Sequence, residues 1–181
     1  SGFGKTYVFY YNNPSNGFKT QAMNSPYYNN KSKNIIMIAV ITIRDFINAW
    51  KNMTGDIDSI YLYLHGGKGV LYFKGQTMNI SQIKSLKSKR VKYGLYLLSC
   101  HGGEGKEGNN VAWALAKLTG TMVFACKGGV SYTKIFSKYF ARSDGKINNK
   151  YSFSAVWGKY YYQKRYIWWG NVIAKYSVGS F

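Results

Sequence analysis

At 181 residues with 46% hydrophobic side chains, the chain is long enough to fold as one domain with a buried core. Its 25 Lys and Arg against 6 Asp and Glu give a net charge of +19. This charge suits nucleic acid, an anionic membrane surface or an acidic protein as partner. The alternative is a soluble surface that is rich in lysine and has no such partner. No apolar run reaches the roughly 18–20 residues of a membrane span, and two Cys exclude a disulfide framework.

The first part of the chain predicts two strands separated by a long loop. Residues 6–11 follow a strand pattern, and residues 12–33 are rich in Asn, Ser, Gly and Pro, which is typical of loops. The second strand, 34–41, is a continuous apolar run. Such a run predicts a parallel strand that is buried on both faces.

A helix is expected to begin directly after this strand. Thr42 is a good N-cap, and Asp45 three positions later completes a capping-box-like pattern. The helix should end near Gly55. The side chains expected to face the core are Phe46, Ile47 and Trp50.

Two further strands each run into a glycine-rich turn. Residues 57–64 are followed by His65-Gly66-Gly67, and residues 93–99 are followed by Cys100-His101-Gly102-Gly103. Between these segments, Val70 to Phe73 predicts a short strand that forms one arm of a hairpin. Ser81 is expected to cap a short basic helix that continues to about Ser88.

The last part of the chain predicts one more helix and several strands. Asn109 or Asn110 should cap the helix, Gly120 should terminate it, and residues 121–126 should form a strand. The Tyr- and Trp-rich stretch between Tyr151 and Tyr176 predicts a hairpin. Strands that alternate with helices predict βαβ units, hence an α/β fold with a mainly parallel sheet and helices on both faces.

His65 and Cys100 are the residues that could carry chemistry. Ligands bind outside the carboxyl ends of strands in an open α/β sheet, so the two side chains would meet if their strands are neighbours. A thiolate is a nucleophile, and an imidazole can generate it and later protonate the leaving group. A cysteine at a strand end is usually a small buried hydrophobe, and a histidine near glycines is often a turn residue. The repeated pattern of buried strand, reactive side chain and double glycine favours the functional interpretation.

The same residues resemble the signature of caspase-like peptidases, which include caspases, legumains, gingipains and clostripain. In that signature a hydrophobic strand precedes His-Gly, and a second precedes a small residue and Cys. The matching segments are Ile60–Leu64 with His65-Gly66 and Leu95–Leu98 with Ser99-Cys100. The resemblance covers about residues 34–126.

This resemblance implies a caspase-like three-layer sandwich with Cys100 as nucleophile and His65 as general acid/base. Backbone N–H groups of Gly66 and Cys100 would form the oxyanion hole. We therefore expect one effector domain over residues 1–181, with its core at about 34–126 and a Tyr/Trp-rich β extension at 150–177. His101 departs from the motif. On an extended chain it would point to the side opposite Cys100, which makes it secondary.

The whole chain also resembles C-terminal toxin modules of Rhs-repeat proteins from Gram-positive bacteria. The segments that carry this second resemblance are Phe9–Pro14, Tyr63–Gly69, Gly108–Trp113 and Tyr166–Gly170. Such modules are secreted or delivered as part of a larger bacterial protein, act in the cytoplasm of the target cell, and are neutralised by an immunity protein. The net charge of +19 is compatible with an acidic immunity protein. The first residues lack the apolar core of a signal peptide, and the Ser-Gly start suggests a domain cut from a longer protein or a cloning scar.

Substrate preference depends on the few acidic residues. Glu104 and Glu107 lie in the loop after Cys100, where Glu104, Gly102 and Gly103 could form the wall of a substrate pocket. A carboxylate in that wall would favour Lys or Arg before the cut. Glu107 could instead place negative charge near the start of the following helix.

Three other classes of function remain open. His65, Cys100, His101 and Cys126 could bind zinc, but they lack the close ligand pair of a zinc finger, so we expect no metal and no other cofactor. The basic stretch Lys84–Lys92 and the aromatic content suit a nucleic-acid binder or nuclease, which would leave Cys100 without a role. A peptidase fold that has lost activity would act as a binding module.

Overall fold

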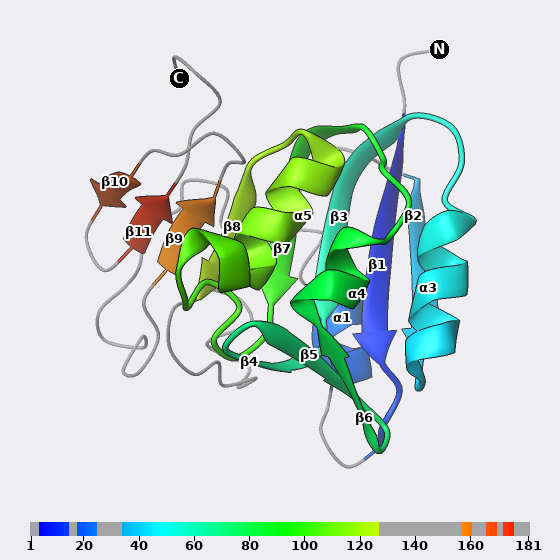
Figure 1. The fold of residues 1–181 in the computed structure, drawn as a ribbon. Coiled ribbons are helices and arrows are strands. Elements are labelled where there is room, and N and C mark those ends of the chain that lie inside the picture. Colours follow the sequence, from blue (N-terminus) through cyan, green and yellow to red (C-terminus); the bar gives the residue numbers. More distant parts are fainter. Residues whose placement is uncertain are drawn as a thin grey trace.

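The chain folds around an eight-stranded sheet with the strand order β10-β11-β9-β8-β7-β3-β1-β2 (Figure 1). The computed structural model describes residues 4–14, 18–24, 34–126, 157–160, 166–169 and 172–175. Five neighbouring strands run parallel, which confirms a mainly parallel α/β core. They are β1 (Lys5–Tyr11), β2 (Ile35–Val40), β3 (Ile57–Tyr63), β7 (Val91–Leu98) and β8 (Val123–Cys126).

Helices flank this parallel sheet. Figure 1 shows α3 (Ile43–Lys51), α4 (Ile80–Lys84) and α5 (Val111–Thr119) in front of the strands, and α1 (Phe18–Asn24) behind them. Helix α1 lies within the stretch that the sequence predicts to be a loop, so that prediction was wrong for residues 18–24. The prediction failed because the apolar pattern of this helix is short and the residues around it, mostly Asn, Ser and Gly, are typical of loops.

The start of α3 confirms the predicted capping box. Thr42 Oγ1 accepts a hydrogen bond from the Asp45 N–H at 3.1 Å, and Asp45 Oδ2 accepts from the Thr42 N–H at 2.9 Å. Hydrogen bonds from the backbone N–H groups of Thr42 and Ile41 hold the pKa of Asp45 below its ordinary value. The helix ends at Lys51 instead of near Gly55, because Lys89 Nζ donates to the Lys51 carbonyl at 2.8 Å and stabilises the helix end there.

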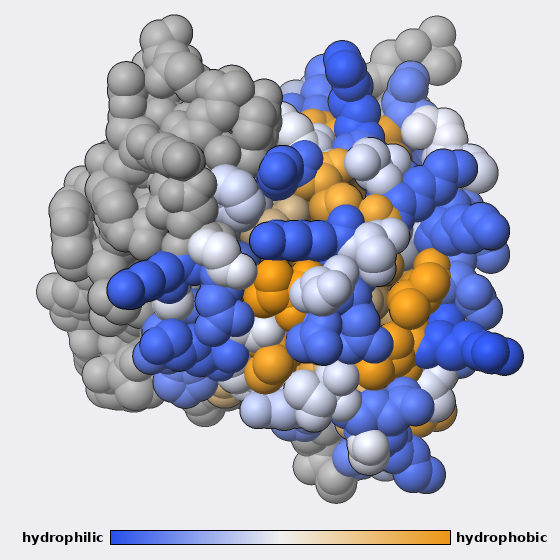
Figure 2. All heavy atoms as spheres, in the orientation of Figure 1, coloured by the Kyte–Doolittle hydropathy of each residue, from blue (hydrophilic) through white to orange (hydrophobic). Residues whose placement is uncertain are grey.

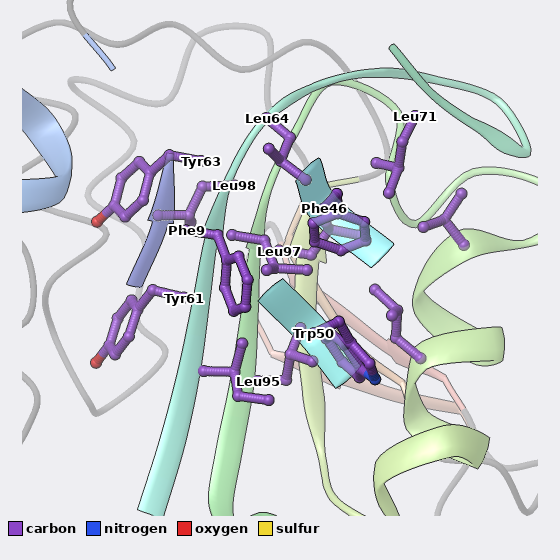
Figure 3. Close-up of a cluster of buried hydrophobic side chains, with 14 of the residues drawn as sticks. Phe9, Phe46, Trp50, Tyr61, Tyr63, Leu64, Leu71, Leu95, Leu97 and Leu98 are labelled. Carbon is purple, nitrogen blue, oxygen red and sulfur yellow. The ribbon is translucent and has the colours of Figure 1, made fainter. Parts of the chain in front are cut away.

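The core on this side of the sheet is aromatic. Phe46 and Trp50 are fully buried against Phe9 of β1, with Phe9 and Phe46 meeting edge to face at 5.5 Å between ring centroids (Figure 3). Ile47, also expected in the core, is 37% exposed. Residues four apart share a helix face, and Ile47 is rotated by one position from that face.

The opposite face of the sheet carries a second set of rings. Tyr96 of β7 stacks between Tyr61 of β3 and Phe124 of β8, with centroid distances of 4.6 and 4.8 Å. Tyr61 and Tyr63 lie on the side of the strands away from Phe46 and Trp50 (Figure 3). Desolvation raises the pKa of Tyr96 to about 12, so its hydroxyl stays protonated at neutral pH.

A small antiparallel sheet connects β3 to α4. It contains β4 (His65–Gly67), β5 (Val70–Phe73) and β6 (Gln76–Asn79), and the predicted hairpin arm at 70–73 is confirmed. Strand β6 was missed because its residues are mostly polar. Helix α4 is shorter than predicted and begins two residues earlier, since Asn79 instead of Ser81 is the N-cap and accepts from the Gln82 N–H at 2.9 Å.

One end of the large sheet differs from the prediction, and the other agrees with it. Strand β2 was expected to be buried on both faces, but it is the outermost strand of the described sheet and Met37 is 37% exposed. An apolar run does not distinguish an edge strand from a central one. At the other end, β9 (Trp157–Tyr160), β10 (Tyr166–Trp169) and β11 (Val172–Lys175) extend the sheet. Strands β10 and β11 form an antiparallel pair, which confirms the hairpin predicted between Tyr151 and Tyr176.

The face in front of the sheet is mostly hydrophilic, with apolar residues visible between the polar ones (Figure 2). Within the described ranges, no helix is both long enough and apolar enough to cross a bilayer.

Candidate active site

The structure brings the His65 and Cys100 segments together at the carboxyl edge of the sheet. Strands β3 and β7 are parallel neighbours, and their last paired residues are Tyr63 and Leu98. His65 and Cys100 each lie two positions beyond this pair. The two segments touch, because a Cβ atom built on Gly66 would overlap Ser99 Oγ and lie 2.9 Å from the Cys100 carbonyl oxygen.

The His65 ring lies among aromatic side chains. Phe18 of α1 meets it edge to face at 4.7 Å between centroids, and Tyr11 at the end of β1 does so at 5.5 Å. Part of His65 remains exposed to solvent, so a substrate could reach it. Desolvation lowers the pKa of His65 below its ordinary value, which favours the neutral imidazole at neutral pH.

This environment predicts a particular pH dependence. Cleavage that needs neutral His65 should persist below the ordinary histidine pKa of about 6.5 and fall as the pH drops through the lowered pKa. The folded state also binds fewer protons than the unfolded state between these two pKa values. Folding stability should therefore fall as the pH drops through the same window.

Phe18→Ala tests the cause of this shift, because it admits water to the His65 ring. The acid limb of the kcat/KM profile should move to higher pH. Phe18→Leu is the matched control, since it keeps an apolar side chain over the ring and should leave the acid limb in place. Equal profiles for wild type and Phe18→Ala would contradict this origin of the shift.

Cys100 lies in a tight turn and not on an extended chain. The Gly102 N–H donates to the Ser99 carbonyl at 3.3 Å, and His101 adopts the left-handed conformation with φ of 57°. Cys100 itself is partly exposed. The prediction that His101 would diverge from Cys100 assumed an extended backbone, so its geometric basis was wrong.

His101 and Glu104 bind each other across this turn. Nδ1 of His101 is 2.6 Å from Oε2 of Glu104, and the Glu104 N–H donates to the His101 carbonyl at 3.1 Å. The Glu104 carboxylate is thus engaged within its own loop. A substrate residue that uses Glu104 would have to compete with His101, and the role of Glu104 in a pocket stays a prediction.

Gly102 and Gly103 form the inner layer of the same loop. Both are buried, and a Cβ built on Gly102 would lie 2.6 Å from Leu97 Cδ2. The Gly103 carbonyl accepts a hydrogen bond from Asn110 Nδ2 at 3.1 Å. The two glycines allow the loop to pack closely against β7 and α5, and their contact with a substrate stays a prediction.

Two residues that shape the site were not identified as site residues from the sequence. Phe18 covers His65, and Tyr72 of β5 lies directly opposite His65 in the small sheet. The Tyr72 ring also borders the backbone of Gly67, and 43% of the residue is exposed. The hairpin predicted at Val70–Phe73 was a signal for Tyr72, whereas nothing local connected Phe18 to His65.

Within the part of the chain that the structure describes, no three His, Cys, Asp or Glu side chains gather closely enough to hold a metal ion. Cys126 ends β8, and its side chain lies outside the described atoms. A hollow of about 1040 Å³ lies at the opposite, amino edge of the sheet. It is lined by Gly4 and residues 53–58, 88–92 and 117–120. No family model matches this chain, and no curated protein matches it either.

Proposed function

We propose that this chain is a cysteine-dependent endopeptidase in which His65 and Cys100 form the catalytic dyad. The pairing of β3 with β7 carries the proposal. His65 and Cys100 follow neighbouring parallel strands, each two positions beyond the last pair, which supports a site where the imidazole meets the thiol at the carboxyl edge. The close contact of Gly66 with Ser99 and Cys100 supports this arrangement.

The reaction then follows from the two groups. Neutral His65 takes the proton of the Cys100 thiol, and the sulfur attacks the carbonyl carbon of the scissile peptide to form an S–C bond and an oxyanion. The imidazolium gives its proton to the leaving amine as the C–N bond breaks. His65 next takes a proton from water, whose oxygen attacks the acyl-enzyme and releases the acid and the thiol.

Backbone geometry supports Gly66 as a donor to the oxyanion. Gly69 has φ of 71° in the two-residue connection between the paired residues Gly67 and Val70, and the pair that closes such a connection is ordinarily a hydrogen-bonded one. Hydrogen-bonded and non-hydrogen-bonded pairs alternate along an antiparallel ladder. Gly66, paired with Leu71, therefore falls on a non-bonded pair, and its N–H points away from β5.

We further propose that the chain is a toxin effector that cleaves a protein in a target cell and is neutralised by an acidic immunity protein. The net charge of +19 supports an acidic partner, because complementary charge accelerates association and suppresses wrong pairings.

The test expresses wild type and Cys100→Ala in a sensitive bacterium and maps new protein termini by mass spectrometry. Wild type should kill and generate new termini, and Cys100→Ala should do neither, because the nucleophile is absent. Cys126→Ala is the matched control, since it removes the other cysteine of the chain and should behave like wild type. Equal killing by Cys100→Ala without new termini would overturn the peptidase proposal.

A nucleic-acid-binding or nuclease role is the second candidate. The hollow at the amino edge of the sheet carries Lys89, Arg90, Lys92 and Lys117, which would suit contact with phosphates. Asp56 and Asp58 line the same hollow, and Lys89 Nζ already binds the carbonyls of Lys51 and Met53. Both features weaken the case for phosphate binding in this hollow. Killing that survives Cys100→Ala would favour the nucleic-acid role instead.

A further inference from the structure

The loop that follows Cys100, residues 101–110, is tied to the strand end that carries the nucleophile. On its near side, the Gly102 N–H donates to the Ser99 carbonyl at 3.3 Å. The Gly102 carbonyl in turn accepts from the Ala112 N–H of α5 at 3.0 Å. Cys100 therefore lies between the end of β7 and Gly102, which is hydrogen-bonded to α5.

The 101–110 loop also touches the hairpin that carries His65. A Cβ built on Gly69, in the turn between β4 and β5, would lie 2.7 Å from Asn109 Cγ. A Cβ built on Gly105 would lie 3.6 Å from Lys68 Cε in the same turn. The loop therefore packs against both halves of the candidate dyad.

Asn110 holds this loop in place. Its side chain is fully buried, and Nδ2 donates to the carbonyls of Gly103 and Gly105, each at 3.1 Å. Its Oδ1 accepts from the Trp113 N–H at 2.9 Å and so caps α5. The amide thus uses both of its N–H donors and its oxygen.

Capping alone does not account for asparagine at this position. The cap needs only the oxygen, and Ser, Thr or Asp would supply it equally well. The two N–H donors bind loop carbonyls that lie outside the helix. Only Asn among the preferred capping residues offers both functions on one short side chain.

We propose that Asn110 is a positioning residue, which holds the 101–110 loop on α5 and thereby sets the placement of Cys100 relative to His65. The Asn110 side chain bonds to Gly103, Gly105 and Trp113, and not to either of these two residues, so it acts through the loop. The inference rests on the proposed dyad. It adds that the geometry of the dyad depends on a buried amide within a neighbouring loop.

Asn110→Asp separates the two functions of the side chain. Aspartate keeps the capping oxygen and adds a negative charge that a helix N-terminus favours, but it removes both N–H donors. Asn79→Asp is the matched control, because Asn79 caps α4 in the same way, accepting from the Gln82 N–H at 2.9 Å. Asn110→Ser is a second variant that keeps a capping oxygen without placing a charge in the buried site.

Two measurements on the folded variants test the proposal. Hydrogen exchange of the backbone amides at 101–109 should be faster in Asn110→Asp and Asn110→Ser than in wild type or Asn79→Asp. The second measurement is the rate at which iodoacetamide alkylates Cys100. For each variant, this rate is divided by the rate for the same variant carrying His65→Gln, and the ratio reports how strongly His65 activates the thiol. That ratio should fall by about tenfold or more in the Asn110 variants, since small displacements of reacting groups cost this much.

Unchanged exchange at 101–109 in both folded Asn110 variants would overturn the inference. Faster exchange with an unchanged His65 ratio would also overturn it, because the loop would then not position the dyad. If the ratio of alkylation rates is one in the wild type, His65 does not activate Cys100 and the proposed dyad is wrong. Exchange at 101–109 would still decide whether Asn110 holds the loop.

Discussion

Replacing Gly66 with alanine is expected to lower kcat for peptide cleavage by about a hundredfold while the protein stays folded. The added methyl group would overlap Ser99 Oγ and lie 2.9 Å from the Cys100 carbonyl oxygen, which is closer than real Cβ contacts. Backbone must then move, and the backbone that moves carries His65 on one side and Cys100 on the other. The measurement is kcat on a cleaved peptide, with circular dichroism to verify folding.

Two further variants make this prediction specific. Gly108→Ala adds the same methyl group to the 101–110 loop where a Cβ would have no neighbour within 4 Å, so its kcat should match wild type. Ser99→Ala should partly restore kcat in the Gly66→Ala background, because it removes the nearest obstructing atom. Ser99 Oγ is buried and has no hydrogen-bond partner among the described residues, so Ser99→Ala alone should be nearly neutral. Wild-type kcat in Gly66→Ala would show that the two strand ends do not form one reactive site.

Trp50→Ala is expected to lower the free energy of unfolding by about 3–5 kcal/mol, the largest stability effect that we predict. Trp50 is fully buried, and its ring lies 5.9 Å from Phe46 and 6.3 Å from Phe9 between centroids. Truncation would leave a cavity between α3 and the sheet. Urea unfolding followed by fluorescence or circular dichroism measures the loss.

Trp50→Phe divides this loss into packing and hydrogen bonding. Phenylalanine keeps much of the buried ring but loses the bond from Nε1 to the Lys87 carbonyl, which is 2.7 Å long. We expect a cost of about 1–3 kcal/mol for that variant, from the lost hydrogen bond and the unfilled space. Both variants should keep wild-type kcat where they are folded, because α3 lies away from the His65 and Cys100 turns. Equal stability of Trp50→Ala and wild type would contradict the packing described for this core.

Much of the fold could be predicted because its signals are local. The capping box of Thr42 and Asp45, the N-cap Asn110 and the left-handed terminator Gly120 each act within one turn of a helix. The last residues of the strands before His65 and Cys100, Ile60–Leu64 and Leu95–Leu98, are continuous apolar runs. Errors arose where a long-range partner decides the outcome, as with Lys89 at the end of α3 and the edge position of β2.

The same division applies to the candidate site. The sequence by itself determined that a histidine and a cysteine each end a buried strand and enter a glycine-rich turn, because apolar runs and glycines act on their own backbone. Only the tertiary structure decided that these strands are parallel neighbours at one register, that Phe18 covers His65, and that Asn110 binds Gly103 and Gly105. The order of the strands, the packing of Phe18 over His65 and the hydrogen bonds of Asn110 to the loop all depend on which distant segments pack together. That choice is made by the whole core and not by any single stretch of the chain.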